Sequence, residues 1–155
     1  MKKILFSICI VFIISACGNN NADEPQVDED SIVSFGNTML WQATLNDSTG
    51  KIEMKRVSIE GADNSSPQTI LASINDEYPE IRLDFLRISH DTAFLKIDDA
   101  HYLTQQMGST GSQMYMAGLV YNLTQNPDVH FVNMNFEEGD HAQPGTFSRE
   151  TFSGQ

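Results

Sequence analysis

Residues 81–97 read IRLDFLRISHDTAFLKI, and this stretch of the sequence decides the class of fold. Two runs rich in apolar and β-branched residues, Ile81–Ile88 and Thr92–Ile97, are typical of β-strands. The polar cluster Ser89-His90-Asp91 lies between them and is typical of a turn. The stretch therefore predicts a β-hairpin, and the other elements can be placed outward from it.

The residues that follow this hairpin predict two helices and a last strand. We expect a short helix, a glycine break, a long helix and a strand at residues 100–107, 108–111, 112–125 and 129–136. Asp98 or Asp99 suits the N-cap of the short helix, because a carboxylate accepts hydrogen bonds from free N–H groups. The long helix is apolar on most sides, which is typical of a central helix packed on a sheet. From Glu137 the chain is polar apart from Phe147 and Phe152, and no further element is predicted.

The residues before residue 81 predict a second hairpin and a helix. Strands are expected at residues 38–45 and 51–59, joined by the turn cluster NDSTG at residues 46–50. The alternation of the second strand slips between Met54 and Val57, which predicts a bulge there. Ser66 followed by Pro67 is typical of a helix start, and this helix should end before Pro79.

The predicted order is β-β-α-β-β-α-α-β, with strands in pairs that suit hairpins. This order indicates an α+β domain, in which helices cover one face of a mixed or antiparallel sheet. The length of 155 residues suits one such domain, and the sequence contains no internal repeat.

Three stretches of the domain carry motifs of a known bacterial family. They are SHDTAFLKID at residues 89–98, Gly108-Ser109, and VYNLTQNPDV at residues 120–129. Together with the order of the elements, they resemble the GerMN domain, which occurs in sporulation and germination proteins and in other envelope lipoproteins. The resemblance covers about residues 38–140. It implies a noncatalytic module associated with wall assembly or with signalling partners.

The N-terminus reads MKKILFSICIVFIISAC and predicts a signal for export. Lys2 and Lys3 precede an apolar run, Ile4–Ile14, that is shorter than the ~20 residues needed to span a bilayer. The last four residues, Ile14 to Cys17, resemble the lipobox of bacterial lipoproteins, which implies that residues 1–16 are removed and that Cys17 receives a lipid. The alternative is an ordinary cysteine after an ordinary signal peptide, which would leave Cys17 without a partner once Cys9 is removed.

Residues 17–31 predict an acidic tether, because they contain five carboxylates, no base and few apolar residues. The whole chain has nine bases and 21 acids, a net charge of −12. Removal of Lys2 and Lys3 with the signal leaves seven bases against 21 acids, a net charge of −14. Five of these acids lie in the tether, so the domain at residues 32–155 has a net charge of −9. Such acidity argues against nucleic acid as a partner and against a polybasic contact with anionic lipid.

A metal site is the first chemical alternative that the sequence raises. His130 and His141 flank an acidic stretch that contains Glu137, Glu138 and Asp140, and these side chains can bind zinc or calcium. The spacing matches no closed structural site, so we expect a solvated loop and no metal. A second trio, Asp98, Asp99 and His101, is explained by helix capping.

Catalytic motifs are missing from the sequence. Ser89-His90-Asp91 contains the three residue types of a hydrolase triad, but neighbours in a tight turn cannot converge as a triad does. No Gly-x-Ser-x-Gly motif or phosphate-binding loop is present. Trp41 and Tyr121 are expected to pack in the core, and a binding patch is the alternative if they share a face. Ser31, Ser48 and Thr92 each follow an aspartate in a pattern that resembles an O-glycosylation motif.

We therefore expect a cell-envelope lipoprotein held in the membrane by a lipid on Cys17, facing the periplasm or the exterior. Its domain is expected to bind an envelope protein or peptidoglycan, without cofactor, metal or catalysis. The alternative is a small envelope hydrolase or metal-dependent enzyme that uses the region from His130 to His141.

Overall fold

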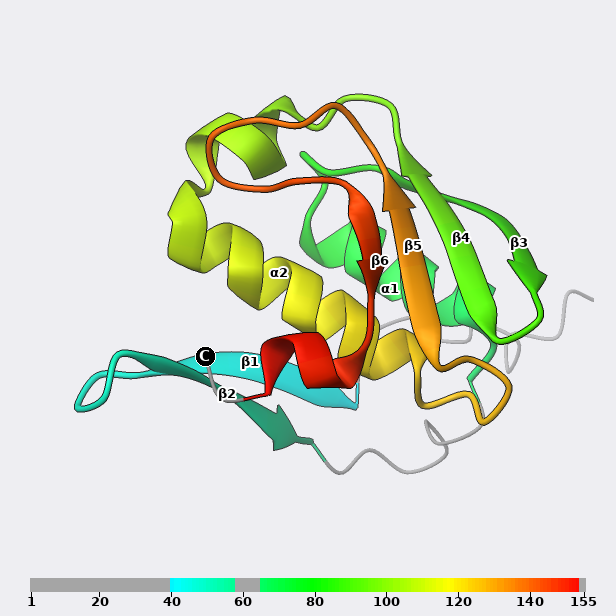
Figure 1. Ribbon diagram of the computed structural model, residues 1–155, viewed down its shortest axis with the longest axis horizontal. Helices are drawn as coiled ribbons and strands as arrows, with labels where there is room; N and C mark the ends of the chain where they lie inside the picture. Colours follow the sequence, from blue (N-terminus) through cyan, green and yellow to red (C-terminus); the bar gives the residue numbers. More distant parts are fainter. Residues whose placement is uncertain (1–39, 58–64, 154–155) are drawn as a thin grey trace, which may run out of the picture. The chain divides into compact units, whose positions relative to one another are not determined.

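The computed structural model describes residues 40–57 and 65–153, and these form the α+β fold that the sequence predicts (Figure 1). Residues 1–16, Cys17, the tether and Ser31 lie outside the described residues. The strands are β1 (Trp41–Asn46), β2 (Lys51–Arg56), β3 (Leu83–Ser89), β4 (Thr92–Ile97), β5 (Phe131–Asn135) and β6 (Gly145–Phe147). The helices are α1 (Pro67–Glu77), the π-helical turn η3 (Tyr102–Gln106), α2 (Gly108–Leu123) and the 3₁₀ turn η4 (Arg149–Phe152).

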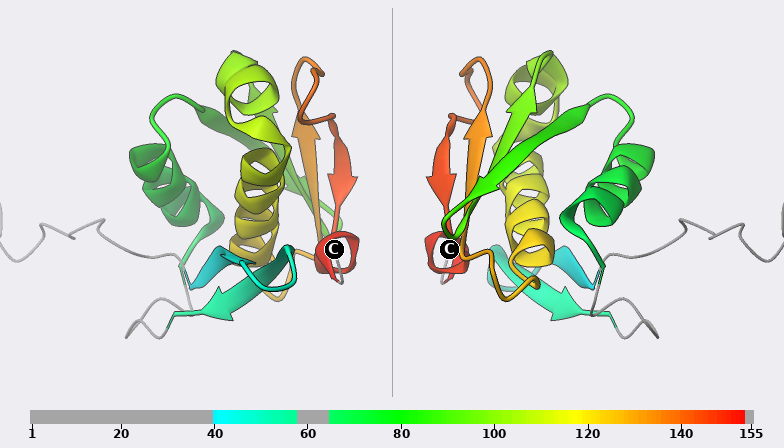
Figure 2. Two further views of the ribbon diagram at one scale, coloured as in Figure 1. Left: turned by 90° about the vertical axis from the view of Figure 1, so that its left-hand side faces the viewer. Right: turned by 90° about the vertical axis from the view of Figure 1, so that its right-hand side faces the viewer.

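The described strands form two sheets. The hairpin of β1 and β2 is one antiparallel sheet, and the other has the order β3-β4-β5-β6, in which only β4 and β5 are parallel. Helices α1 and α2 lie on the same face of the larger sheet (Figure 2). The first hairpin therefore does not extend that sheet, and it packs against α2 instead.

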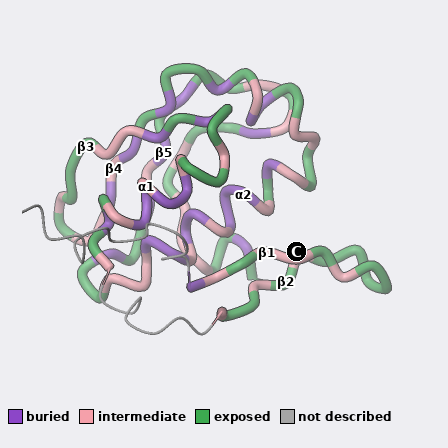
Figure 3. Tube along the Cα trace, turned by 180° about the vertical axis from the view of Figure 1, so that it is seen from behind, coloured by how far each residue is buried: buried purple, intermediate pink, exposed green. Residues whose placement is uncertain are grey.

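Helix α2 is the centre of the domain. It carries eight buried residues, and Ala117, Val120 and Leu123 among them have no exposed surface. The buried positions follow α2 along its length, whereas the tip of the β1–β2 hairpin is exposed (Figure 3). The apolar sequence of this helix thus predicts its central place correctly.

The start of α1 follows from its sequence. Ser66 is the N-cap, and its Oγ accepts a hydrogen bond from the Thr69 N–H at 3.2 Å. Pro67 is the first helical residue, where its missing N–H leaves no bond unmade. The helix ends at Glu77, before Pro79, as predicted.

Two local details of the second half differ from the prediction. Residues 108–111 do not form a non-helical break before the long helix, because α2 begins at Gly108 and continues through Gly111. Only Gly108 departs from helical backbone, with a φ of 71° that glycine adopts without strain. The short helix at 100–107 is one π-helical turn, with Asp99 accepting a hydrogen bond from the His101 N–H at 3.0 Å.

The bulge predicted in the second strand is not found, and β3 carries a bulge instead. The pairing of β1 with β2 is regular from Trp41–Arg56 to Asn46–Lys51, whereas β3 shifts register between Phe85 and Arg87. At the C-terminal end, β6 and η4 follow Glu137, where no element is expected. Strand β6 has only three residues, which is too short for a periodic signal, and pairing with β5 decides its conformation.

Candidate functional site

Trp41 is held in place by a buried amide of helix α2. Asn122 is 1% exposed, and its Oδ1 accepts hydrogen bonds from the N–H groups of Leu40 at 2.7 Å and Trp41 at 3.0 Å. Its Nδ2 donates to the carbonyls of Trp41 and Gly118, both at 2.8 Å. All four hydrogen bonds of the amide are thus made inside the protein, and the N-terminal end of β1 is joined to α2.

A small pocket lies beside Trp41, between β1, α1 and α2. Its volume is about 140 Å³, and its lining is Trp41, Gln42, Ala43, Ile74, Glu77, Tyr78, Met114, Tyr115, Gly118, Leu119 and Asn122. The inner wall is apolar, because Ile74 and Leu119 are buried. Gln42 and Glu77 are exposed and place polar groups at the mouth. We call this space the Trp41 pocket.

Two buried donors of the Trp41 pocket have no hydrogen-bond partner among the described residues. They are Nε1 of Trp41 and the hydroxyl of Tyr115. Tyr115 is 4% exposed, and this burial raises the pKa of its hydroxyl above the ordinary value, with a further contribution from Tyr78. Leaving a buried donor unpaired is unfavourable by about 1–3 kcal/mol. Both atoms are sealed from solvent, so these two donors are enclosed by the packing around Trp41 and Tyr115.

Tyr78 and Glu77 connect the interior of the pocket with its mouth. The rings of Tyr78 and Tyr115 meet edge to face, with their centroids 5.0 Å apart. Burial raises the pKa of Tyr78, and the Glu77 carboxylate raises it further through its charge and a side-chain hydrogen bond. Negative charge is therefore already present at the mouth of the pocket.

Arg149 covers Trp41 and Tyr121 on another side. The rings of Trp41 and Tyr121 pack edge to face at 5.3 Å, and the Arg149 guanidinium lies 5.2 Å and 5.0 Å from their centroids. Arg149 also donates from Nε to Thr124 Oγ1 at 2.8 Å and from Nη2 to the Tyr121 carbonyl at 2.9 Å. Burial lowers its pKa. Trp41 and Tyr121 thus share a face, and a cation stacks on both rings.

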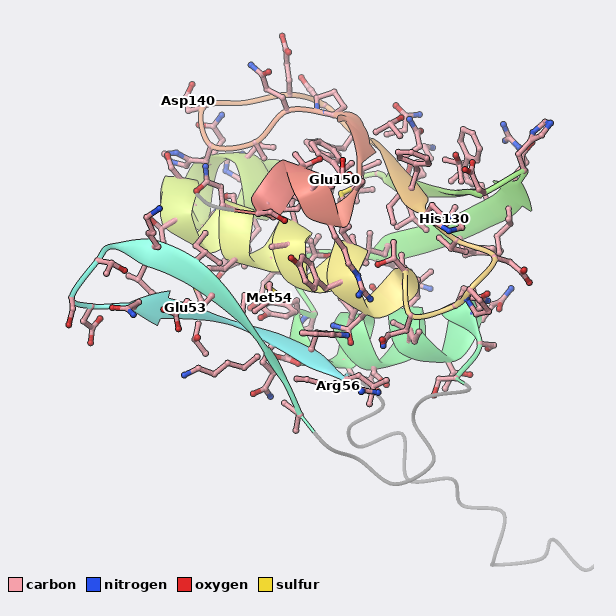
Figure 4. All side chains as sticks on the ribbon, turned by 60° about the horizontal axis from the view of Figure 1, so that its bottom comes forward. Glu53, Met54, Arg56, His130, Asp140 and Glu150 are labelled. Atoms are coloured by element: carbon pink, nitrogen blue, oxygen red, sulfur yellow. The ribbon has the colours of Figure 1, made fainter. Side chains whose placement is uncertain are left out.

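The histidines of the predicted metal alternative are not brought together. His130 lines a hollow of about 360 Å³ beside Arg149, whereas the Nδ1 of His141 lies 3.1 Å from Ser109 Oγ. Asp140 and His130 lie on opposite sides of the domain (Figure 4). In residues 40–57 and 65–153, no three His, Cys, Asp or Glu side chains gather as ligands for one ion.

The second trio lies in an acidic hollow of about 200 Å³. Its lining includes all three residues of the trio and also Glu137 and Glu138. The fold thus brings the two acidic stretches close together although they are far apart in the sequence. Asp98 forms an ion pair with Lys96, and Asp99 has the capping role described above.

Ser89, His90 and Asp91 form the turn that the sequence predicts. His90 has a φ of 57°, Ser89 Oγ lies 3.3 Å from His90 Nδ1, and the Asp91 carboxylate accepts from Thr92 Oγ1 at 3.3 Å. Asp91 therefore bonds to the next residue and not to His90. Of the two described glycosylation candidates, Ser48 is exposed in the first hairpin turn and Thr92 is half-buried in β4.

Sequence reasoning missed most of the residues of the Trp41 pocket. The sequence places Tyr115, Gly118 and Asn122 in a central helix and Arg149 in a polar C-terminal stretch, and it gives none of them a role in a site. One signal could have been used: a glycine and an asparagine are unusual in an otherwise apolar helix, and each points to a close contact there.

Comparison with known proteins leaves the family open. The chain matches no protein-family model, and no curated protein sequence is significantly similar to it. A 2.5 Å crystal structure of a candidate lipoprotein from Clostridium perfringens has a TM-score of 0.42 and 19% identity, over 72% of this chain and 85% of that chain. This likeness is too distant to indicate a function. Within the described residues, the helices are too short or too polar to cross a bilayer.

Proposed function

We propose that this protein is a bacterial envelope lipoprotein, anchored through a lipid on Cys17, whose GerMN-like domain binds a partner without catalysis. The observation that carries the proposal is the N-terminal sequence. A basic start, a short apolar run and the tetrad Ile14 to Cys17 together have the form of a lipoprotein signal. The acidic residues 18–31 then act as a spacer of roughly 20 Å between membrane and domain.

A binding role is supported by the polar groups of the domain. The Trp41 pocket offers an apolar wall beside the exposed polar side chains of Gln42 and Glu77, which suits recognition of a ligand. The Ser89, His90 and Asp91 side chains belong to one turn and do not form a triad. Peptidoglycan or an envelope protein is the partner that fits a domain displayed at a membrane.

The anchor is tested by replacing each cysteine in turn. Cells that express the wild type, Cys17→Ala or Cys9→Ala are fed a clickable fatty acid, and the protein is isolated and assayed for the label. We expect label in the wild type and in Cys9→Ala, whose cysteine lies inside the signal, and none in Cys17→Ala. Label on Cys17→Ala, or none on the wild type, would contradict lipid anchoring.

Binding is tested separately by crosslinking whole envelopes and isolating the tagged protein. The proposal expects a reproducible envelope protein or peptidoglycan fragment in the isolate. It also expects purified protein to leave peptidoglycan intact. Hydrolysis of peptidoglycan that is abolished by changing His130 and His141 to alanine would favour the enzyme alternative.

A further inference from the structure

We propose that the Trp41 pocket binds the aliphatic ammonium group of a lysine-type side chain carried by a peptide. This inference deepens the proposed function and depends on it, because it names the class of ligand that the binding module would recognise. It rests on three features of the pocket: its size, its apolar wall, and the exposed Glu77 at its mouth. A lysine of an envelope protein and the free amine of a peptidoglycan peptide share this chemistry.

The size of the pocket indicates that one side chain enters and not a whole ligand. A volume of about 140 Å³ exceeds the ~30 Å³ share of one water, and is below the ~300 Å³ of pockets that enclose a whole small molecule. The space therefore suits a short chain of carbon atoms that reaches in from a larger molecule.

The inner wall favours a chain of methylene groups. Ile74 of α1 and Leu119 of α2 are buried residues of the lining. Ala43 of β1 and Met114 of α2 line the same space and are partly exposed, so a ligand can reach them. The flexible thioether of a methionine adapts its shape to what it contacts. Burial of the four methylene groups of a lysine side chain against this wall is favourable, because it removes apolar surface from water.

The charge at the mouth favours a cation over an anion. Glu77 is exposed, and it is the only charged residue among the described residues that line the pocket. Burial raises the pKa of Tyr78, and the negative charge of Glu77 raises it further, so the carboxylate lies close to a second residue of the lining. An ammonium group at the mouth is attracted to this carboxylate, whereas a ligand carboxylate or phosphate is repelled.

The end of helix α1 strengthens this preference. Glu77 is the last residue of α1, and the carbonyl groups at the C-terminal end of a helix carry a partial negative charge. The last turn of α1 contains no basic residue that would compensate either charge. Gln42 is exposed at the mouth as well, and its carbonyl oxygen can accept a further hydrogen bond from an ammonium group.

Four substitutions separate the effect of charge from the effect of space. Glu77→Gln removes the charge and keeps the length of the side chain, and Asp76→Asn is its matched control, because Asp76 is exposed but does not line the pocket. Gly118→Leu fills the pocket from α2, since a Cβ built on Gly118 meets no atom within 4 Å. Gly111→Ala is the control for that change, because Gly111 does not line the pocket and its Cβ would make ordinary contacts of 3.5 Å with Met107.

The chain contains one tryptophan, which lines the pocket, so the indole signal of Trp41 reports binding there. The full chain, ¹⁵N-labelled on its indole and held in a neutral detergent, is titrated with Nα-acetyl-lysine methylamide and with the norleucine compound, which has the same carbon stem without the ammonium group. The wild type should bind the lysine compound about fivefold more tightly, as expected for a partly exposed ion pair. This preference should vanish in Glu77→Gln and persist in Asp76→Asn. Gly118→Leu should bind neither compound, and Gly111→Ala should bind as the wild type does.

A second titration identifies the source of the amine. Peptidoglycan fragments with a free side-chain amine are compared with the same fragments after acetylation of that amine. A saturable shift that acetylation abolishes supports the inference with peptidoglycan as the source. A shift with the lysine compound and none with the fragments supports it with a protein lysine as the source.

Three results would overturn the inference. They are no shift with the lysine compound in the wild type, a preference for lysine that survives in Glu77→Gln or is lost equally in Asp76→Asn, and undiminished binding by a folded Gly118→Leu. If Gly118→Leu does not fold, the exposed substitution Glu77→Gln decides the matter. Envelope partners that still crosslink to a folded Gly118→Leu at the wild-type level would refute the inference and leave the proposed function intact. Absence of any crosslinked partner from the wild type would refute the proposed function itself.

Discussion

The side chain of Asn122 pairs with the backbone of Trp41 as a neighbouring strand would. Its Oδ1 accepts from the Trp41 N–H at 3.0 Å, and its Nδ2 donates to the Trp41 carbonyl at 2.8 Å. Asn75 of α1 repeats this arrangement at Leu83, where the corresponding distances are 2.8 Å and 3.0 Å. In both cases a helical asparagine satisfies backbone groups at the start of an edge strand, on the side where that strand has no neighbour.

The first prediction concerns these two asparagines. Asn122→Ala should lower the free energy of unfolding by about 3 kcal/mol, because it leaves buried backbone groups of β1 without partners. Asn75→Ala should lower it by about 1 kcal/mol, since Asn75 is only half-buried and water can replace its amide. Urea unfolding followed by Trp41 fluorescence measures both. Equal losses in the two variants would contradict the role given to burial.

The second prediction concerns Arg149. Arg149→Ala should lower the free energy of unfolding by about 2 kcal/mol, through the loss of two hydrogen bonds and of its stacking on two rings. Arg149→Lys should restore less than half of this, because an ammonium group cannot reproduce the planar fork of a guanidinium. Arg82 is exposed, and Arg82→Ala serves as the control with a change below about 0.5 kcal/mol. A similar loss of stability in Arg82→Ala would show that the net charge of the protein, and not the contacts of Arg149, determines the change in the free energy of unfolding.

The third prediction compares two glycines. Gly118→Ala should raise the free energy of unfolding by about 0.5–1 kcal/mol, because alanine favours the helix and its Cβ meets open space. Gly139→Ala should lower it by about 1–3 kcal/mol, since its Cβ would lie 2.7 Å from Thr104 Cβ and 2.5 Å from Gln105 Nε2. Thermal unfolding of both variants measures the difference. If both substitutions raise the free energy of unfolding, the side chains of Thr104 and Gln105 must move to accommodate the new Cβ, which would contradict this prediction.

The fourth prediction concerns alkaline pH. Burial raises the pKa of Tyr115 and of Tyr78 in the folded state, whereas in the unfolded chain tyrosine titrates near pH ~10. The unfolded state therefore releases protons first. The stabilising contribution is complete below pH ~10 and falls above it by up to ~1.4 kcal/mol per pH unit for each tyrosine.

Tyr115→Phe separates the two tyrosines. The variant should lose stability less steeply between about pH 10 and 11.5, because only Tyr78 then contributes. At pH 7 it should be more stable than the wild type by about 1 kcal/mol, since it no longer buries an unpaired hydroxyl. Urea unfolding at pH 7, 9, 10 and 11 gives both quantities. The same pH dependence in both proteins would contradict the assignment.

Local signals predicted the elements whose ends are set by neighbouring residues. Ser66 and Pro67 define the start of α1, and the turn at residues 89–91 defines the start of β4 at Thr92. The bulge in β3 and the pairing of β6 were not predictable in this way. Both depend on how a strand fits its neighbours and on contacts between residues distant in the sequence.

The candidate site could be predicted only in part. Trp41 and Tyr121 are candidates in the sequence because aromatic residues are common in binding patches and in cores, and the fold brings their rings into contact. Nothing local to Tyr115 shows that its hydroxyl is buried without a partner. That property arises from the packing of β1, α1 and α2 around one space.

The sequence by itself determined the prediction of an export signal ending at Cys17, the acidity of the chain and the α+β class. These depend on composition and on short linear motifs, which can be read without knowledge of distant contacts. Only the tertiary structure decided that Asn122 binds Trp41 and that Arg149 stacks on Trp41 and Tyr121. These contacts join residues 28 to 108 positions apart along the chain, and folding alone brings their atoms within hydrogen-bonding and stacking distance.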